Sequence, residues 1–196
     1  MILYLDTETT GLRPGNICQL SYVMQDAFGV VAKNFFFTVD AVEYSAYMVH
    51  GFSVPELFRL SGGKRFNAFV DEISYDLKNA DAIVAHNVDF DLAFLRAEFN
   101  NVGVSFNYKQ AICSMKTAVP VCKLMRSRGV GYKYPKLTEF CDFLHITEDE
   151  IVEYEKRWFG TVSHSHDARF DTVALALCCN KAMQNCPEFS CLKELI

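Results

Sequence analysis

The chain has 196 residues, of which 51% are hydrophobic and 22% charged, with a formal net charge of −5 at pH 7. These values exclude a disordered chain and favour one globular domain with a substantial core. No apolar run approaches the roughly 18 residues that a membrane-spanning helix needs, so no membrane partner is expected. Asp6 interrupts the first apolar run, so no signal peptide is expected.

The first predicted element is a buried strand at residues 1–5, which leads into the sequence Asp-Thr-Glu-Thr-Thr-Gly. Side chains two apart on a strand share a face, so Asp6 and Glu8 should point the same way, with Thr7 turned away. Two carboxylates at that spacing repel each other unless a cation lies between them. The alternative is a strand that simply ends in polar residues before a turn at Gly11.

The following elements are predicted from periodicity. Strands at 17–24 and 30–39, with a turn near 26–29, indicate a hairpin. Apolar residues at helical spacing predict a helix over 66–79, and a short apolar run predicts a strand at 82–85.

The next predicted helix covers residues 89–99 and carries Asp91 in its first turn. An acid there also complements the helix dipole, and Asn87 is a candidate N-cap, so a purely structural role is open. Asp89 is the local rival to Asp91 as a site residue, but Asp91 has the better spacing from His86 and Asn87.

Residues 111–115 suggest a fifth strand, and helices are predicted at about 136–144 and 167–184, which completes a mixed α/β pattern. The last helix carries Asp171, and His166 lies five residues earlier, on the loop that leads into the helix. His164 is a nearby alternative. A lone histidine before a helix is more often a surface or capping residue; the pairing with Asp171 favours a functional role.

Three segments of the chain resemble the DEDDh 3′–5′ exonucleases, the family of polymerase proofreading subunits, RNase T and oligoribonucleases. Asp-x-Glu-Thr-Thr-Gly occurs at 6–11, His-Asn-x-x-Phe-Asp at 86–91, and His-x-Ala-x-x-Asp-x-x-Ala at 166–174, in the family's order. Weaker similarity lies at 49–53 and 135–146. The resemblance implies an RNase H-like mixed sheet with helices on both faces, formed by an exonuclease domain at 1–184 and followed by a short tail at 185–196.

The resemblance also implies a two-metal hydrolase. Its metal ligands would be Asp6, Glu8, Asp91 and Asp171: Asp6 would bridge both ions, Glu8 and Asp171 would hold the ion on the nucleophile side, and Asp91 would act mainly through water. All-oxygen ligation suits two Mg²⁺ or Mn²⁺ ions. His166 would be the general base, a role that suits imidazole at neutral pH. The expected products are nucleoside 5′-monophosphates.

The expected partners are DNA or RNA 3′ ends, and the sequence does not separate the two sugars. By the same resemblance, the Thr9 backbone would meet the terminal 3′-OH, and His86 and Asn87 would contact the terminal nucleotide. Some relatives dimerise, which leaves a homodimer open.

The net charge is negative, but positive charge is concentrated at 109–136, a basic stretch that contains seven Lys and Arg residues and no acid. Arg126, Arg128 and Lys133 lie there beside Tyr132 and Tyr134, a composition that could hold phosphates and stack bases. A solvated connector with a positive bias is the alternative reading.

Two other function classes stay open on the sequence. One is a nucleic-acid-binding module of the same fold with weak catalysis. The other is a subunit that docks onto a DNA polymerase, with residues 185–196 as a short docking peptide. The eight cysteines contain no Cys-x-x-Cys pair, which argues against a thiolate zinc site, and reduced thiols in the cytoplasm are the expectation.

Overall fold

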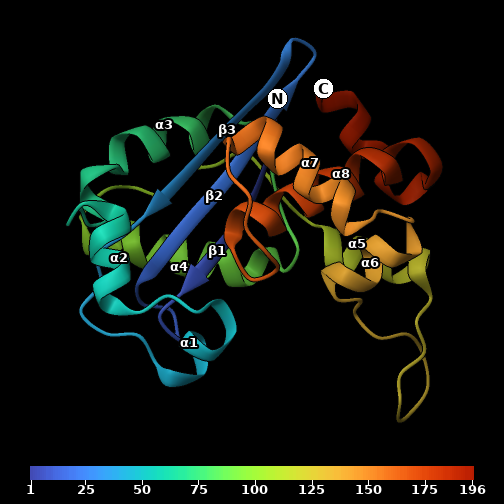
Figure 1. The fold of residues 1–196 in the computed structure, drawn as a ribbon. Coiled ribbons are helices and arrows are strands. Elements are labelled where there is room, and N and C mark those ends of the chain that lie inside the picture. Colours follow the sequence, from blue (N-terminus) through green and yellow to red (C-terminus); the bar gives the residue numbers. More distant parts are fainter.

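The computed structural model describes all residues, 1–196, and is built on a five-stranded sheet with the order β3-β2-β1-β4-β5 (Figure 1). The strands are β1 (Ile2–Thr9), β2 (Ile17–Asp26), β3 (Gly29–Phe36), β4 (Ala82–Ala85) and β5 (Ala111–Cys113). β1 pairs antiparallel with β2, and β2 with β3, whereas β4 runs parallel to both β1 and β5. The sheet is therefore mixed, as predicted.

Helices cover both faces of this sheet because the apolar side chains of β1 alternate. Ile2 and Tyr4 belong to one buried core, and Leu3 and Leu5 belong to the other. The first core lies under α5 (Ser114–Cys122), α6 (Leu137–Phe143), α7 (Glu148–Phe159) and α8 (Ala168–Asn185). The second lies under the 3₁₀ helix η1 (Phe66–Ala68), α3 (Val70–Asn79) and α4 (Val88–Asn101).

Two further helices, α1 (Tyr44–His50) and α2 (Val54–Ser61), lie toward the end of the molecule where β1 ends; in Figure 1, α1 is below the sheet and α2 is to its left. The opposite end holds both termini and the 3₁₀ helix η2 (Pro187–Leu195). The carboxyl end of β1 is thus flanked by short helices and loops, while the termini lie far from it.

The hairpin and the strand at 82–85 are confirmed, with Asp26 opposite Gly29 at the turn. The single helix predicted over 66–79 is interrupted at Phe69, which has φ −123° and ψ 0° and separates η1 from α3. The strand predicted at 111–115 is wrong beyond Cys113, because Ser114 already begins α5.

Four helices were missing from the prediction: α1, α2, α5 and α7. α5 contains Pro120, a residue that argues against a helix interior. α7 buries only Ile151 and Glu155, so its apolar stripe is too thin to stand out among its charges.

Residues 185–196 pack against the domain. Phe189 and Leu192 have no exposed surface, and the N-terminal amine donates a hydrogen bond of 2.7 Å to the Leu195 carbonyl. A docking role for this segment would require these side chains to leave the core.

The eight cysteines are free thiols, and six of them are buried. No helix in the structure combines the length and apolarity needed to cross a membrane.

Candidate metal and nucleic-acid site

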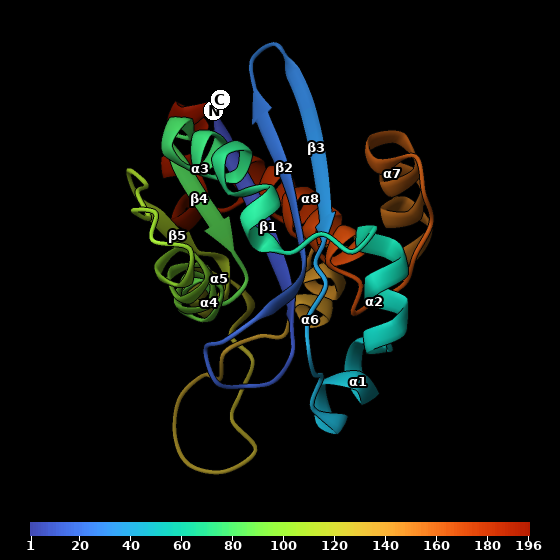
Figure 2. The same ribbon diagram turned by 90° about the vertical axis from the view of Figure 1, so that its left-hand side faces the viewer.

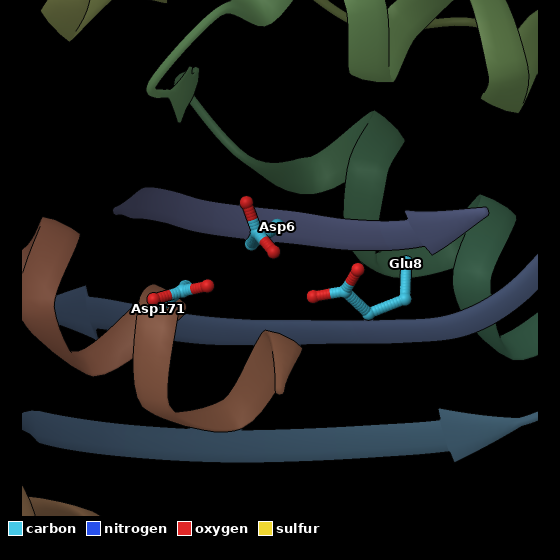
Figure 3. A group of neighbouring side chains, drawn as sticks. All are labelled: Asp6, Glu8 and Asp171. Carbon is cyan, nitrogen blue, oxygen red and sulfur yellow. The ribbon is translucent and has the colours of Figure 1, made fainter. Parts of the chain in front are cut away.

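The site starts from three carboxylates that meet between β1 and α8. Asp6 and Glu8 leave the face of β1 that α8 covers, and Asp171 lies in the first turn of α8. Each offers an oxygen, and these oxygens lie within 4.8 Å of one another. Figure 3 shows the three side chains turned toward one another across the gap between strand and helix. We refer to these three residues as the carboxylate cluster.

Asp91 reaches the same region from α4. Since β4 pairs with β1 only as far as Tyr4, the end of β1 is free on that side, and α4 begins there. The Thr7 hydroxyl donates a hydrogen bond of 2.8 Å to Asp91 Oδ1. Asp91 is buried beside the carboxylate cluster, and its charge raises the pKa of both Asp6 and Glu8. The structure therefore brings all four predicted acids together, with Asp91 outside the closest set.

Burial and mutual repulsion disfavour the ionised forms of these acids. Burial raises the pKa of Asp6 well above its ordinary value, and the charges of Asp171, Asp91 and Glu8 add to the effect. Burial, followed by the charge of Asp171, raises the pKa of Glu8 to about 9. Burial raises the pKa of Asp91 and of Asp171 to about 7. Four such oxygen donors can share this space as anions when a cation neutralises them, so the residues present fit a divalent metal site.

His166 lies on the segment 160–166, which leads into α8. Its backbone N–H donates a hydrogen bond of 3.0 Å to Asp171 Oδ2, and its φ of 68° lies in the left-handed region. Its side chain is exposed. His164 is also exposed, and its Nδ1 bonds to the Ser165 carbonyl. Burial is the main influence on the pKa of Asp171 and raises it, whereas the charge of His164 lowers it. Both histidines thus belong to the surroundings of Asp171.

Glu155 of α7 anchors the segment 160–166, a role that no pattern in the sequence predicts. Its carboxylate has no exposed surface and accepts two bonds from Ser163, 2.9 Å from the backbone N–H and 2.6 Å from the hydroxyl. An acid within a charged helix looks like any solvated residue. Only the packing of α7 shows that this one anchors the segment that carries His166.

Gln19 and Asp167 fix the start of α8 in a similar way. Asp167 caps the helix through the Arg169 N–H at 3.0 Å and pairs with the Arg169 side chain at 2.6 Å. Gln19 of β2 donates to Asp167 at 2.9 Å and accepts from the Ala168 N–H at 3.1 Å. Although burial acts to raise the pKa of Asp167, the bonds from Arg169 and Gln19 lower it. The sequence analysis missed both residues; an Asp directly before a helix is an N-cap signal that could have marked Asp167, whereas no such signal marks Gln19.

A cavity of about 310 Å³ opens beside Glu8 and Thr9, with Leu12, Val49 and Phe90 in its wall. This size suits a small ligand such as one nucleotide.

Thr9 lies at the edge of that cavity, and its backbone is held by His50. His50 Nδ1 accepts from the Phe52 N–H at 3.0 Å, so Nε2 carries the proton and donates to the Thr9 carbonyl at 3.2 Å. Burial lowers the pKa of His50, which agrees with a neutral ring. This fixes the end of β1 against α1.

His86 and Asn87 differ in their availability to a ligand. His86 uses both ring nitrogens within the protein, at 2.9 Å from the Ser114 hydroxyl and 3.0 Å from the Pro135 carbonyl. Asn87 is exposed and begins α4, but its side chain makes no capping bond. Its amide makes no hydrogen bond within the protein. The rival Asp89 is exposed and pairs with Lys116.

The 123–136 loop of the basic stretch extends beyond the carboxyl end of β1, on the opposite side from α1 (Figure 2). Arg126 Nε donates to the Tyr132 carbonyl at 3.1 Å, and a bridge joins Met125 to Tyr132. Lys133 pairs with Glu139. Arg128 makes no ion pair, so the loop presents exposed positive charge and exposed tyrosines on the side of the site.

No family model matches the chain, and neither does any curated protein sequence. Among solved structures, the zinc-bound form of an E. coli exonuclease I complex with single-stranded DNA is 18% identical, with a TM-score of 0.73. The alignment covers 98% of this chain but 42% of exonuclease I. The metal-free form of that complex is 17% identical, with a TM-score of 0.66 and the same coverage.

The nuclease domain of 3′hExo, a DEDDh family member bound to rAMP, is 14% identical, with a TM-score of 0.64. The alignment covers 95% of this chain and 93% of that domain, so the two correspond over nearly their whole length. The chain therefore has the RNase H-like fold that these proteins share, as the resemblance implied.

Proposed function

We propose that the chain is a metal-dependent 3′–5′ exonuclease of the DEDDh type, which releases nucleoside 5′-monophosphates from the 3′ ends of DNA or RNA. The observation that carries this proposal is the carboxylate cluster: three acids from two distant motifs have oxygens within 4.8 Å of one another. The fold supports it, since solved relatives of this fold are complexes with single-stranded DNA or rAMP.

The reaction would be hydrolysis at the last phosphodiester. Asp6, Glu8 and Asp171 would hold two Mg²⁺ or Mn²⁺ ions, and Asp91 would be oriented by Thr7 to contribute through water. Such ions, when bound, neutralise charge on the phosphate and make bound water more acidic. His166 would accept the proton of the attacking water. The bond between phosphorus and the 3′ oxygen breaks, which leaves a free 3′-OH on the shortened strand.

The cavity beside Glu8 would take the terminal nucleotide. Leu12 is 80% exposed at its mouth, where it would meet a base, and Phe90 supplies an aromatic wall. In this pose the Thr9 backbone lies near the terminal sugar, and the Asn87 amide is free to contact the same nucleotide. A polymerase partner, a homodimer and a cytoplasmic location stay predictions from the sequence.

A 3′-phosphate should block digestion. The cavity next to Glu8 suits one terminal nucleotide, and an added dianion there would repel the carboxylates. We would digest matched 5′-labelled strands that end in 3′-OH or 3′-phosphate, as DNA and as RNA, with Mg²⁺ and with Mn²⁺.

The expected result is stepwise release of mononucleotides from the 3′-OH strands only, and none in EDTA. Cleavage of a circular strand would indicate an endonuclease instead. Binding without metal-dependent release would indicate a binding module with the same fold.

Removing charge from Arg126 and Arg128 should weaken substrate binding and flatten its salt dependence. Each lost phosphate contact lowers the slope of log K against log salt by roughly 0.7 on single strands. Lys133→Gln should change the slope less, because Lys133 already pairs with Glu139. Fluorescence anisotropy over a salt series measures these slopes. Lys193→Gln, at the opposite end of the molecule, is the matched control; equal slopes in all variants would make the loop a solvated connector.

A further inference from the structure

A second cavity, of about 350 Å³, is lined in part by Asn16, at the end of the loop that follows β1. It opens between the start of β2, η1 and the end of α4, and its lining includes Ile17, Phe66 and Asn101. The Asn16 carbonyl on its rim accepts a hydrogen bond from the Thr10 N–H at 3.1 Å. The cavity therefore neighbours the end of β1 but shares no lining residue with the cavity beside Glu8.

The chemistry of this cavity centres on Glu98, whose residue surface is only 6% exposed. Its Oε1 accepts from the Ile17 N–H at 2.8 Å. Its Oε2 accepts no hydrogen bond from the protein. Every side-chain nitrogen or oxygen that is fully buried in the structure does have a hydrogen-bond partner, so Oε2 is not fully buried. Oε2 must therefore reach open space, and the cavity that Glu98 lines provides it. A nearly buried carboxylate with one unpaired oxygen requires a hydrogen-bond donor.

Three asparagines line the same cavity as Glu98: Asn16, Asn67 and Asn101. All three are exposed, and none of their side-chain amides makes a hydrogen bond within the protein. Phe37 and Phe66 add apolar surface from the core, with ring centroids 5.3 Å apart. The cavity thus combines a carboxylate acceptor, free amide donors and aromatic surface.

We propose that this cavity binds a nucleobase that presents a ring N–H beside a carbonyl, which means guanine, uracil or thymine. The ring N–H would donate to Glu98 Oε2, and the flanking carbonyl would accept from the asparagine amides. Adenine and cytosine present an unprotonated ring nitrogen at the corresponding position, which a carboxylate repels. The cavity volume falls in the usual range for small-molecule sites.

This site goes beyond the proposed hydrolysis and does not depend on it. The base could belong to a free nucleoside or to a strand held by the protein. Titrations in EDTA separate the site from the carboxylate cluster, because no ion is bound and strands stay intact. Failure of the base site would leave the exonuclease proposal untouched, and the reverse also holds.

The test is calorimetric titration of the full chain with thymidine, uridine and guanosine, compared with cytidine and adenosine. We expect the first three to bind at least about tenfold more tightly, the size of one hydrogen bond to a charged group. Glu98→Gln should remove the preference. Asn67→Ala and Asn101→Ala, both on exposed residues, should weaken binding without affecting the fold. Glu153→Gln on α7 is the matched control for loss of an acid.

Fluorescence anisotropy with oligothymidylate and oligodeoxycytidylate tells whether the bound base comes from a free nucleoside or from a strand. A Glu98-dependent preference among nucleosides assigns a free nucleoside as ligand, and one seen only among oligomers assigns a base of the strand. Equal binding of thymidine and cytidine, together with equal binding of the two oligomers, would overturn the proposal. So would binding that Glu98→Gln, Asn67→Ala and Asn101→Ala all leave unchanged.

Discussion

Asp6→Asn is expected to lower hydrolysis by at least about 10³-fold, since charge stabilisation by bound metal contributes several kcal/mol to such reactions. The Asp6 carboxylate has oxygen neighbours from both Glu8 and Asp171 within 4.8 Å, and the resemblance assigns to Asp6 the contact with both ions. A single-turnover assay with labelled strands in Mg²⁺ and in Mn²⁺ measures the loss. Asp171→Asn should behave similarly, and near wild-type turnover in either variant would contradict the two-metal assignment.

Asp6→Asn should also be more stable than the wild-type protein when no metal is present. Burial and like charges raise the pKa of Asp6, and that of Glu8 to about 9, so the folded protein holds protons that the unfolded chain has released. Stability of the metal-free protein is then lost as pH rises from the ordinary carboxyl range toward these raised values. Asn at position 6 removes one of the repelling charges.

Thermal unfolding in EDTA at pH 5 and at pH 8 checks this stability effect. We expect Asp6→Asn to raise the melting temperature at pH 8 and to change it less at pH 5. A variant that is inactive and also unfolds more easily at pH 8 would show that Asp6 serves the fold instead of the metal.

The acids of the site could be predicted from the sequence because their positions depend on local geometry. Asp6 and Glu8 share a face because strands alternate, and Asp171 lies near the start of its helix. The meeting of these elements follows from the sheet order β3-β2-β1-β4-β5, which places β1 in the centre. No periodicity encodes that order; an RNase H-like mixed sheet was predicted only from the resemblance to a family.

The residues that hold the site in place could not be predicted. Glu155 acts through Ser163, which follows it by 8 residues, and Gln19 acts through Asp167 and Ala168, which follow it by 148 and 149 residues. Neither Glu155 nor Gln19 belongs to a motif. His86 shows the opposite case, since it stands in a motif but both its nitrogens bond within the protein. A motif thus marks a position that matters without saying whether the side chain meets a substrate or secures a loop.

His166→Ala is expected to lower turnover by about 10²–10⁴-fold, the usual contribution of a general base. His166 directly precedes the Asp167 that caps α8, and its backbone N–H bonds to Asp171, so its position is fixed relative to the carboxylate cluster. An alanine keeps that backbone bond. The loss should therefore fall on turnover, with metal affinity and substrate affinity close to wild type, as measured by calorimetry and by binding in EDTA.

His164→Ala is the matched control, because His164 is an exposed histidine on the same segment and its ring bonds only to the neighbouring Ser165 carbonyl. It should retain nearly wild-type turnover. Glu155→Gln should lie between the two, because it loosens the hold on Ser163 without removing an imidazole. Turnover that falls in His164→Ala but persists in His166→Ala would move the base to His164 and show that the third motif was aligned wrongly.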